Sequence, residues 1–202
     1  MNPEKHNKLI VGIIAASLVL MVIGVISYNS YRNKSNIFEY NGFSVYDADK
    51  NGLKLYQIKF FKEGSNQPLI VNSRYHPKDL EEILVNIDLR KILIKKELYI
   101  TMEPTLSGKA TIAFSEINKY LENPYLFNLP TYPALLNNVV DNELPKITCG
   151  NVTEDISVIM FKIGEKNAIY NDNGCVILEA INEDELIKAA DRLSLTMLGI
   201  MK

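Results

Sequence analysis

Residues that could carry out acid, base or nucleophilic chemistry are sparse in this sequence of 202 residues. It has two histidines, and only His76 lies in the segment predicted to fold as a domain, because His6 precedes a long apolar run. A histidine-based metal site or a Ser-His-Asp triad would therefore depend on His76 alone. His76 precedes a proline in a predicted surface turn, which favours a solvated or capping role. The sequence contains no GxSxG, HExxH, CxxC or phosphate-loop motif, so the patterns typical of common catalytic sites are missing.

Carboxylates are the remaining candidates for catalysis, because glycoside hydrolysis uses a pair of them. Glu103 stands at the end of a predicted strand, and Asp79, Glu81 and Glu82 stand in a predicted turn. Acidic residues at the ends of elements are usually solvated, so their positions favour a surface role. We predict no catalytic residue and no cofactor site.

The segment Asp47–Gly52 matches the first half of an EF-hand calcium loop, with oxygen-bearing side chains at alternate positions before a glycine. The twelfth position of such a loop supplies a bidentate glutamate, whereas this chain has Ile58 there. The alternation that begins at Leu53 predicts a strand where the EF-hand has a helix. A hairpin turn explains the Asp, Asn and Gly residues without a metal, so we predict no metal site.

Cys149 and Cys175 are the only cysteines, and each lies at or beside a predicted strand. A disulfide between them would join two neighbouring strands, provided that the chain is exported to an oxidising compartment. Two buried free thiols are the alternative, because cysteine packs as a small apolar residue. Asn33 and Asn151 each begin an Asn-x-Ser/Thr sequence, which makes them possible glycosylation sites on an exported chain.

An uncharged apolar run, Leu9–Tyr28, precedes all of these candidate residues. Twenty helical residues extend about 30 Å, which is the thickness of the hydrocarbon core of a bilayer. A cleaved signal peptide is the alternative, but its apolar region usually has about 7–15 residues and ends in a small-x-small site. This run is longer and ends in bulky residues, so we predict an uncleaved transmembrane anchor.

The orientation of the anchor depends on features far from it. Lys5 and Lys8 precede the run, but Arg32 and Lys34 follow it closely, so the positive-inside rule hardly discriminates. The cysteines and the sequons all follow the run, which favours export of the C-terminal part. We predict a single-pass protein of the cell membrane, with residues 1–8 as a cytoplasmic arm, 9–28 as the anchor, 29–36 as a linker and 37–202 as an extracytoplasmic domain.

The segment 37–202 has a suitable length for one domain, and its patterns predict an α+β fold. Alternating residues on both sides of the turn at Asp47–Gly52 predict a β-hairpin. The stretch 123–144, with three prolines, predicts an irregular connection. The other predicted elements, in chain order, are a short helix or turn within Tyr75–Ile83, a strand at Leu98–Met102, a helix from Ser107-Gly108 to Asn123-Pro124, strands at Ile147–Cys149, Ser157–Ile163, Ala168–Tyr170 and Cys175–Ile181, and a C-terminal helix.

The C-terminal helix has the clearest signals. Asn182 is a favourable N-cap, and Glu185 stands three residues later, as in a capping box. An apolar stripe follows, which predicts that the helix packs against the sheet formed by the preceding strands. The stripe consists of Leu186, Ala190, Leu193 and Met197.

The C-terminal sequence GCVILEAINEDELIKAADRLSLTMLGIM, together with the segments HPKDLEEI, LYITMEP and ATIAFSEI, resembles uncharacterised archaeal single-pass membrane proteins. The resemblance implies an N-terminal anchor followed by a cysteine-containing extracytoplasmic α+β domain. The shared motifs are structural, so the resemblance implies no catalytic mechanism. The strand-then-helix ending is also similar to domains of some archaeal surface-layer proteins, which implies a role in envelope architecture.

The charge balance gives no indication of a nucleic-acid partner or of an anionic lipid surface, and we predict no nucleic-acid partner. The chain after residue 8 has 20 basic and 23 acidic residues without a block of like charge, whereas nucleic-acid binding needs a basic surface. We predict an envelope-associated binding or structural module whose partners are the lipid bilayer, through the N-terminal helix, and an envelope protein or glycan. The alternatives are a carboxylate-based envelope hydrolase and an accessory subunit of a membrane complex.

Overall fold

The computed structural model describes residues 13, 16–28, 37–50, 52–61, 66–137 and 143–202. The chain divides into two compact units, Met1–Ile37 and Phe38–Lys202. In the first unit, residues 16–28 are helical. Among the described residues, no helix has both the length and the apolar content needed to cross a membrane. The predicted arm (1–8), the predicted linker (29–36) and residues 9–12 and 14–15 of the predicted anchor lie outside the described residues.

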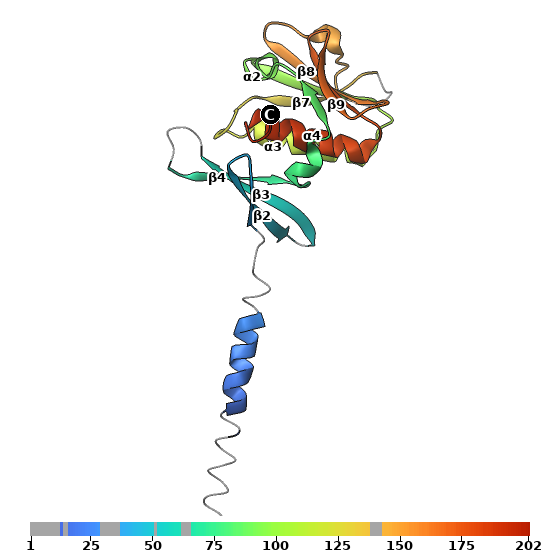
Figure 1. The fold of residues 1–202 in the computed structure, drawn as a ribbon. Coiled ribbons are helices and arrows are strands. Elements are labelled where there is room, and N and C mark those ends of the chain that lie inside the picture. Colours follow the sequence, from blue (N-terminus) through green and yellow to red (C-terminus); the bar gives the residue numbers. More distant parts are fainter. Residues whose placement is uncertain (1–12, 14–15, 29–36, 51, 62–65, 138–142) are drawn as a thin grey trace, which may run out of the picture. The chain divides into compact units, whose positions relative to one another are not determined.

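The second unit is a mixed α+β domain, as predicted, and contains two sheets (Figure 1). The smaller sheet has the order β1-β2-β3-β4, and β3 is antiparallel to both of its neighbours. Its strands are β1 (Ile37–Tyr40), β2 (Phe43–Lys50), β3 (Leu53–Phe61) and β4 (Pro68–Ser73).

The larger sheet has the order β5-β9-β10-β8-β6-β7. Strands β10, β8, β6 and β7 are parallel to one another, and β9 is antiparallel to β10. The bounds are β5 (Leu84–Asn86), β6 (Glu97–Met102), β7 (Thr131–Leu135), β8 (Ile156–Ile163), β9 (Ala168–Asp172) and β10 (Cys175–Ala180).

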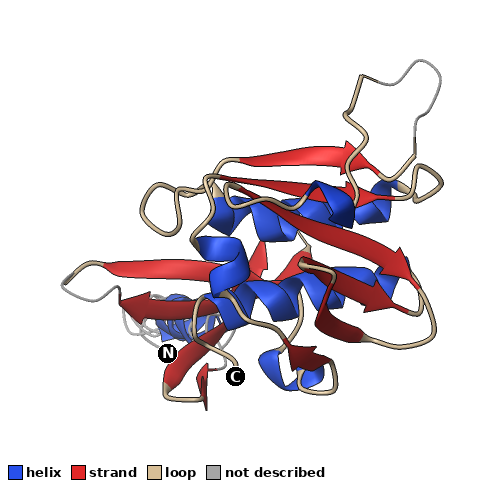
Figure 2. Ribbon diagram, turned by 90° about the horizontal axis from the view of Figure 1, so that it is seen from above, coloured by secondary structure: helices blue, strands red, loops and turns tan. Residues whose placement is uncertain are grey.

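Two long helices, α3 (Gly108–Leu121) and α4 (Glu183–Met197), lie side by side between the two sheets (Figures 1 and 2). One continuous core contains apolar residues of both helices and of the facing sides of both sheets. Shorter elements join the strands. They are the 3-10 helices η1 (Pro77–Leu80) and η2 (Cys149–Asn151) and the helical turn α2 (Arg90–Leu93).

Helix α4 confirms the prediction that it packs on the preceding strands, but it is buried on more sides than one sheet can cover. Besides the predicted stripe, its polar residues Asp191, Arg192 and Ser194 are buried. The predicted N-cap is confirmed, because the Asn182 Oδ1 atom accepts the Glu185 N–H at 2.9 Å. The Glu185 carboxylate accepts hydrogen bonds from Lys188 and Asn167 rather than completing a capping box.

The predicted hairpin is confirmed, and its strands run further into the turn than the sequence indicates. Lys50 pairs with Leu53, and the Asp49 Oδ1 atom accepts the Gly52 N–H at 2.9 Å. The turn between β9 and β10 is also confirmed. It uses positive φ angles at Asn173 (45°) and Gly174 (86°), which glycine and asparagine adopt at least cost.

Two predictions between residues 123 and 149 are wrong. The stretch predicted to be irregular contains β7, in which Pro133 is tolerated because β7 is an edge strand and need not donate every hydrogen bond. The predicted strand Ile147–Cys149 is instead reduced to an isolated bridge between Lys146 and Leu135, followed by η2.

The predicted disulfide is confirmed, since Cys149 and Cys175 are bonded with their Cα atoms 5.2 Å apart. The bond lies in a small apolar cluster on the side of the larger sheet that faces away from α3 and α4. Val158, Cys175 and Ile177 form its buried centre. The segment around η2 covers this centre with Ile147, Cys149 and Val152, so the disulfide holds that cover on the sheet.

Removal of the disulfide is expected to lower the free energy of unfolding. A bond that closes a loop across a separation of 26 residues stabilises by about 3–4 kcal/mol in the chain-entropy account. Chemical denaturation of the double variant Cys149→Ser, Cys175→Ala, followed by circular dichroism, measures the loss. Reductant should destabilise the wild-type chain similarly and leave the double variant unaffected. An unchanged unfolding energy in the variant would contradict the expectation.

Candidate functional site

The order of strands in the larger sheet reverses between β6 and β8. Strand β6 leads through α3 to β7 on one side, whereas β8 leads through β9 to β10 on the other. Ligands of open α/β sheets bind outside the carboxyl ends of the strands at such a reversal. The carboxyl ends of β6 and β8 are therefore the place where the fold favours a binding site.

A crevice of about 380 Å³ lies at this place. Its volume falls within the range of small-ligand sites, about 300–1,000 Å³. Five of its described lining residues are apolar and three are polar. The apolar residues are Leu106, Leu136, Met160, Phe161 and Ile163, and the polar ones are Glu103, Thr105 and Lys162.

The two charged residues of the crevice are each oriented by a partner. The Glu103 Oε2 atom accepts a hydrogen bond from the Asn137 side chain at 3.2 Å. The Lys162 ammonium lies 3.4 Å from the Glu179 Oε2 atom. The crevice thus has one acidic and one basic side chain beside an apolar wall, and each of the two is oriented by a neighbouring side chain.

Glu179, the ion-pair partner of Lys162, also binds the turn between β8 and β9. Its buried carboxylate accepts the Tyr170 hydroxyl at 2.6 Å and the Glu165 N–H at 3.2 Å. The hydrogen bond from Tyr170 is the main reason that the pKa of Glu179 is lowered, and the same bond raises the pKa of Tyr170 to about 12. A Cβ atom at Gly164 would overlap the Glu179 side chain, so any larger residue there would displace the carboxylate from its present position.

A carboxylate of the protein occupies the N-terminal end of α3. Glu183 accepts the Ser107 N–H at 3.1 Å and the Ser107 hydroxyl at 2.5 Å. The hydroxyl bond is the main cause of the lowered pKa of Glu183. Helix N-termini beside parallel strands commonly bind ligand phosphates. Here Glu183 takes that position, so the crevice offers an apolar wall rather than an anion site.

Replacement of Glu183 by glutamine is expected to destabilise the domain by about 1 kcal/mol at pH 7, the usual size of a capping interaction. Because the folded-state pKa of Glu183 is lowered, its ionised form stabilises the fold above the unfolded-state pKa. That contribution is lost as pH falls through the folded-state pKa.

Chemical denaturation of the wild type and of the Glu183→Gln variant at pH 7 and pH 3 measures this loss of unfolding free energy. The Glu165→Gln variant, at an exposed position, is the control for removal of one charge. A difference between Glu183→Gln and the wild type that persists unchanged at pH 3 would contradict the assignment.

A second polar centre lies between α4 and the end of β4. Asp191 is 1% exposed, and its Oδ2 atom accepts hydrogen bonds from the Ser73 hydroxyl at 2.9 Å and from the Arg74 and Tyr75 N–H groups at 2.7 and 3.1 Å. Burial, and next the charge of Glu116, raise the pKa of Asp191 to about 7. The carboxylate fastens the smaller sheet to the helices, so its role is structural.

The raised pKa of Asp191 predicts a specific pH dependence. The folded chain keeps a proton on Asp191 up to a pH of about 7, whereas the unfolded chain loses it near 3.8. The native state therefore binds more protons over this interval, and the unfolding free energy contributed by Asp191 falls as pH rises through it.

The Asp191→Asn variant isolates this contribution, because it keeps an acceptor oxygen and cannot titrate. The unfolding free energy of the wild type minus that of the variant, measured by denaturation at several pH values, should decrease between pH 4 and pH 7. An increase over that interval would show that the three donors favour the ionised carboxylate more than burial disfavours it.

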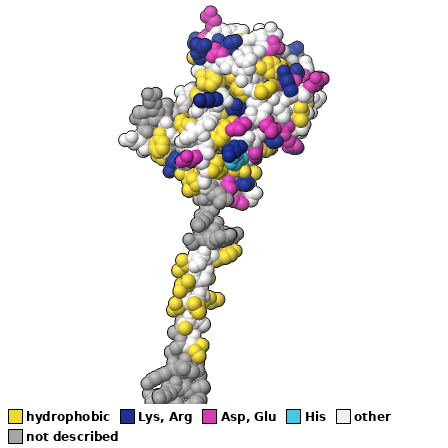
Figure 3. Space-filling model, in the orientation of Figure 1, with side chains coloured by type: hydrophobic (Ala, Val, Ile, Leu, Met, Phe, Trp, Pro, Cys, Tyr) yellow, Lys and Arg dark blue, Asp and Glu magenta, His cyan; other side chains and the backbone are white. Residues whose placement is uncertain are grey.

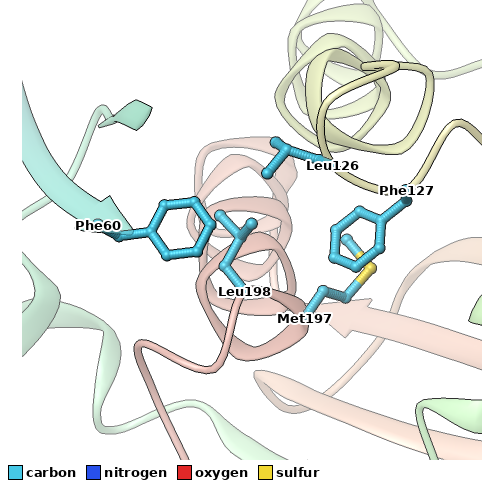
Figure 4. A pocket seen from close by; sticks show the side chains of 5 residues that line it. All are labelled: Phe60, Leu126, Phe127, Met197 and Leu198. Carbon is cyan, nitrogen blue, oxygen red and sulfur yellow. The ribbon is translucent and has the colours of Figure 1, made fainter. Parts of the chain in front are cut away.

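A smaller cavity of about 160 Å³ lies between β3, the segment after α3 and the end of α4. Phe60 lies on one side of it, and Phe127 and Met197 lie on the other (Figure 4). Leu126 and Leu198 complete the lining, so none of the described residues that line it has a polar side chain. Without a polar group to orient a ligand, this cavity is a packing gap rather than a site.

The predicted capping role of His76 is confirmed. Its Nδ1 atom accepts the Lys78 N–H at 3.1 Å at the start of η1. Its ring stacks on Phe38 with the centroids 4.2 Å apart and meets the edge of Tyr56 at 5.1 Å. The histidine therefore joins η1 to the smaller sheet.

The carboxylates considered for hydrolysis are distributed over different elements. Glu103 lines the crevice, whereas Asp79, Glu81 and Glu82 lie on or beside η1, which packs against α4. None of these three lines the crevice among the described residues. The structure thus does not bring a second predicted carboxylate to Glu103.

The remaining predicted positions are in turns or outside the described residues. Asp47 faces Lys54 at 3.7 Å in the β2–β3 hairpin. No group of three or more potential metal ligands occurs within the described part of the chain. Asn151 is exposed in η2, and its Oδ1 atom accepts the Thr148 N–H at 2.8 Å. Asn33 lies outside the described residues, and glycosylation of both asparagines stays a prediction.

The crevice was not among the predicted sites, because its walls come from β6 and β8, which are neighbours only in the folded sheet. Comparisons with protein-family models, with curated proteins and with solved structures give no match to this chain. The resemblance to archaeal single-pass membrane proteins therefore stays a prediction.

Proposed function

We propose that this protein is a membrane-anchored extracytoplasmic module that binds a partner in the crevice between β6 and β8. The observation that carries the proposal is the helical segment 16–28, whose described side chains are all exposed. None of residues 16–28 is charged, so no side of this helix carries a charge, and hydrophobic side chains project from the face of the helix seen in Figure 3. A helix that is apolar on every side is typical of a membrane span, which supports the anchor at residues 9–28.

The disulfide supports the extracytoplasmic location. Bonds such as Cys149–Cys175 persist in oxidising compartments and are rare in the cytosol. Because both cysteines follow the apolar segment, the domain that contains them is the exported part under this proposal.

The lining of the crevice supports binding over catalysis. Glu103 is the one carboxylate among the described residues that line it, whereas hydrolysis of a glycan needs two facing carboxylates. Apolar side chains form the wall, and one acid and one base stand at its polar end. This arrangement suits an apolar side chain of an envelope protein, with its adjacent backbone, better than it suits a glycan.

The test uses the full chain in its native membrane. We expect alkaline carbonate to leave the chain in the membrane fraction and externally added protease to digest the domain. A photo-crosslinking residue at Ile163, which lines the crevice, should form a protein adduct. The same residue at Leu84, which is 71% exposed on β5, should not.

A Thr105→Trp variant, which fills the mouth of the crevice, should abolish the adduct at position 163. Release of the chain by carbonate would refute the anchor. Equal adducts at positions 163 and 84, or an adduct unaffected by Thr105→Trp, would refute the crevice as the binding site.

A further inference from the structure

The smaller sheet buries one of its faces and exposes the other. Val45, Ile58 and Val71 pair across β2, β3 and β4 and are at most 2% exposed, because they face α3 and α4. Side chains alternate between the faces of a strand. On each strand, the residues that alternate with these three therefore form the opposite face of the sheet, which we name the outer face.

The outer face is apolar and nearly uncharged. Phe61 and Ile70 are both 57% exposed, and Leu53 is 43% exposed. Lys59, which pairs with Ile70, and Lys50, which pairs with Leu53, are the two charged residues among the described outer-face positions of β2, β3 and β4. These positions are Ser44, Tyr46, Ala48, Lys50, Leu53, Leu55, Gln57, Lys59, Phe61, Pro68, Ile70 and Asn72.

The sequence limits how far this sheet can lie from the proposed anchor. Eight residues, 29–36, separate Tyr28 from the start of β1 at Ile37. Even a fully extended chain of that length reaches only about 30 Å. The smaller sheet is therefore the part of the domain that the linker joins directly, within reach of the headgroup region.

We propose that the outer face of β2–β4 docks on the membrane surface, with Phe61, Ile70 and Leu53 in the headgroup region and Lys59 at the lipid phosphates. Exposed apolar and aromatic side chains accompanied by lysine are the composition that binds at lipid interfaces. The absence of carboxylates from the described outer-face positions removes repulsion from anionic lipid. This inference rests on the anchor of the proposed function.

The sequence contains no tryptophan, so one introduced residue reports on one position. Phe61→Trp places the reporter on the outer face, and Ile94→Trp, at a position that is 75% exposed after α2, is the matched control. The full chain is reconstituted in vesicles of phosphatidylcholine and phosphatidylglycerol with brominated acyl chains. We expect bromine to quench Phe61→Trp at least twofold more than Ile94→Trp, together with a blue shift of its emission.

A third variant adds Ile70→Glu to Phe61→Trp, which places a carboxylate in the exposed part of the outer face. Its quenching should fall to the level of Ile94→Trp, while circular dichroism shows an unchanged fold. Quenching that survives Ile70→Glu would overturn the docking.

Flotation of the vesicles separates failure of this inference from failure of the anchor. Chains that do not float refute the anchor and the docking together. Chains that float but show equal quenching in Phe61→Trp and Ile94→Trp refute the docking alone. A blue shift that grows with protein density without bromine quenching would show that the outer face pairs with a second copy, which also overturns the docking.

Discussion

The burial of α4 between two sheets is the constraint on which the rest of the domain depends. A helix in that position must satisfy its polar groups from within the protein, because water does not reach them. Asp191 meets three donors at the end of β4, and the Ser194 hydroxyl donates to the Glu116 carbonyl of α3 at 3.1 Å. Near its first turn, Glu183 holds Ser107 at the start of α3. One helix thus positions the smaller sheet, α3 and the edge of the larger sheet where the crevice lies.

The same helix determines the character of the crevice. Because the Glu183 carboxylate already occupies the N-terminus of α3, the fold's usual position for a ligand anion is filled from within. The crevice retains an apolar wall and two oriented charges, Glu103 and Lys162. This composition suits recognition of an amphipathic group, and the buried Glu179 carboxylate, 3.4 Å from the Lys162 ammonium, orients the lysine.

The sequence predicted correctly those elements that are determined by residues close together along the chain. The Asn182 cap, the Asn173-Gly174 turn and the β2–β3 hairpin depend on residues close together in sequence, and they agree with the structure. Strand β7 escaped prediction because Pro133 argues against a strand unless the strand lies at a sheet edge, which is a property of the whole sheet. The crevice escaped for the same reason, since β6 and β8 become neighbours only when the sheet assembles. Asp191 was hidden because its partners lie in β4 and just after it, far away in sequence.

The arrangement of the two sheets also sets the order in which the chain can complete its fold. The first strands of the domain, β1–β4, can pair with one another as soon as they emerge, because their contacts are local. Their inner face, however, is covered by helices that include α4, near the end of the chain. During synthesis from the N-terminus, α3 can cover part of this face, but the remainder stays uncovered until residues 183–197 arrive. An interrupted chain that lacks α4 would therefore leave part of an apolar sheet face exposed.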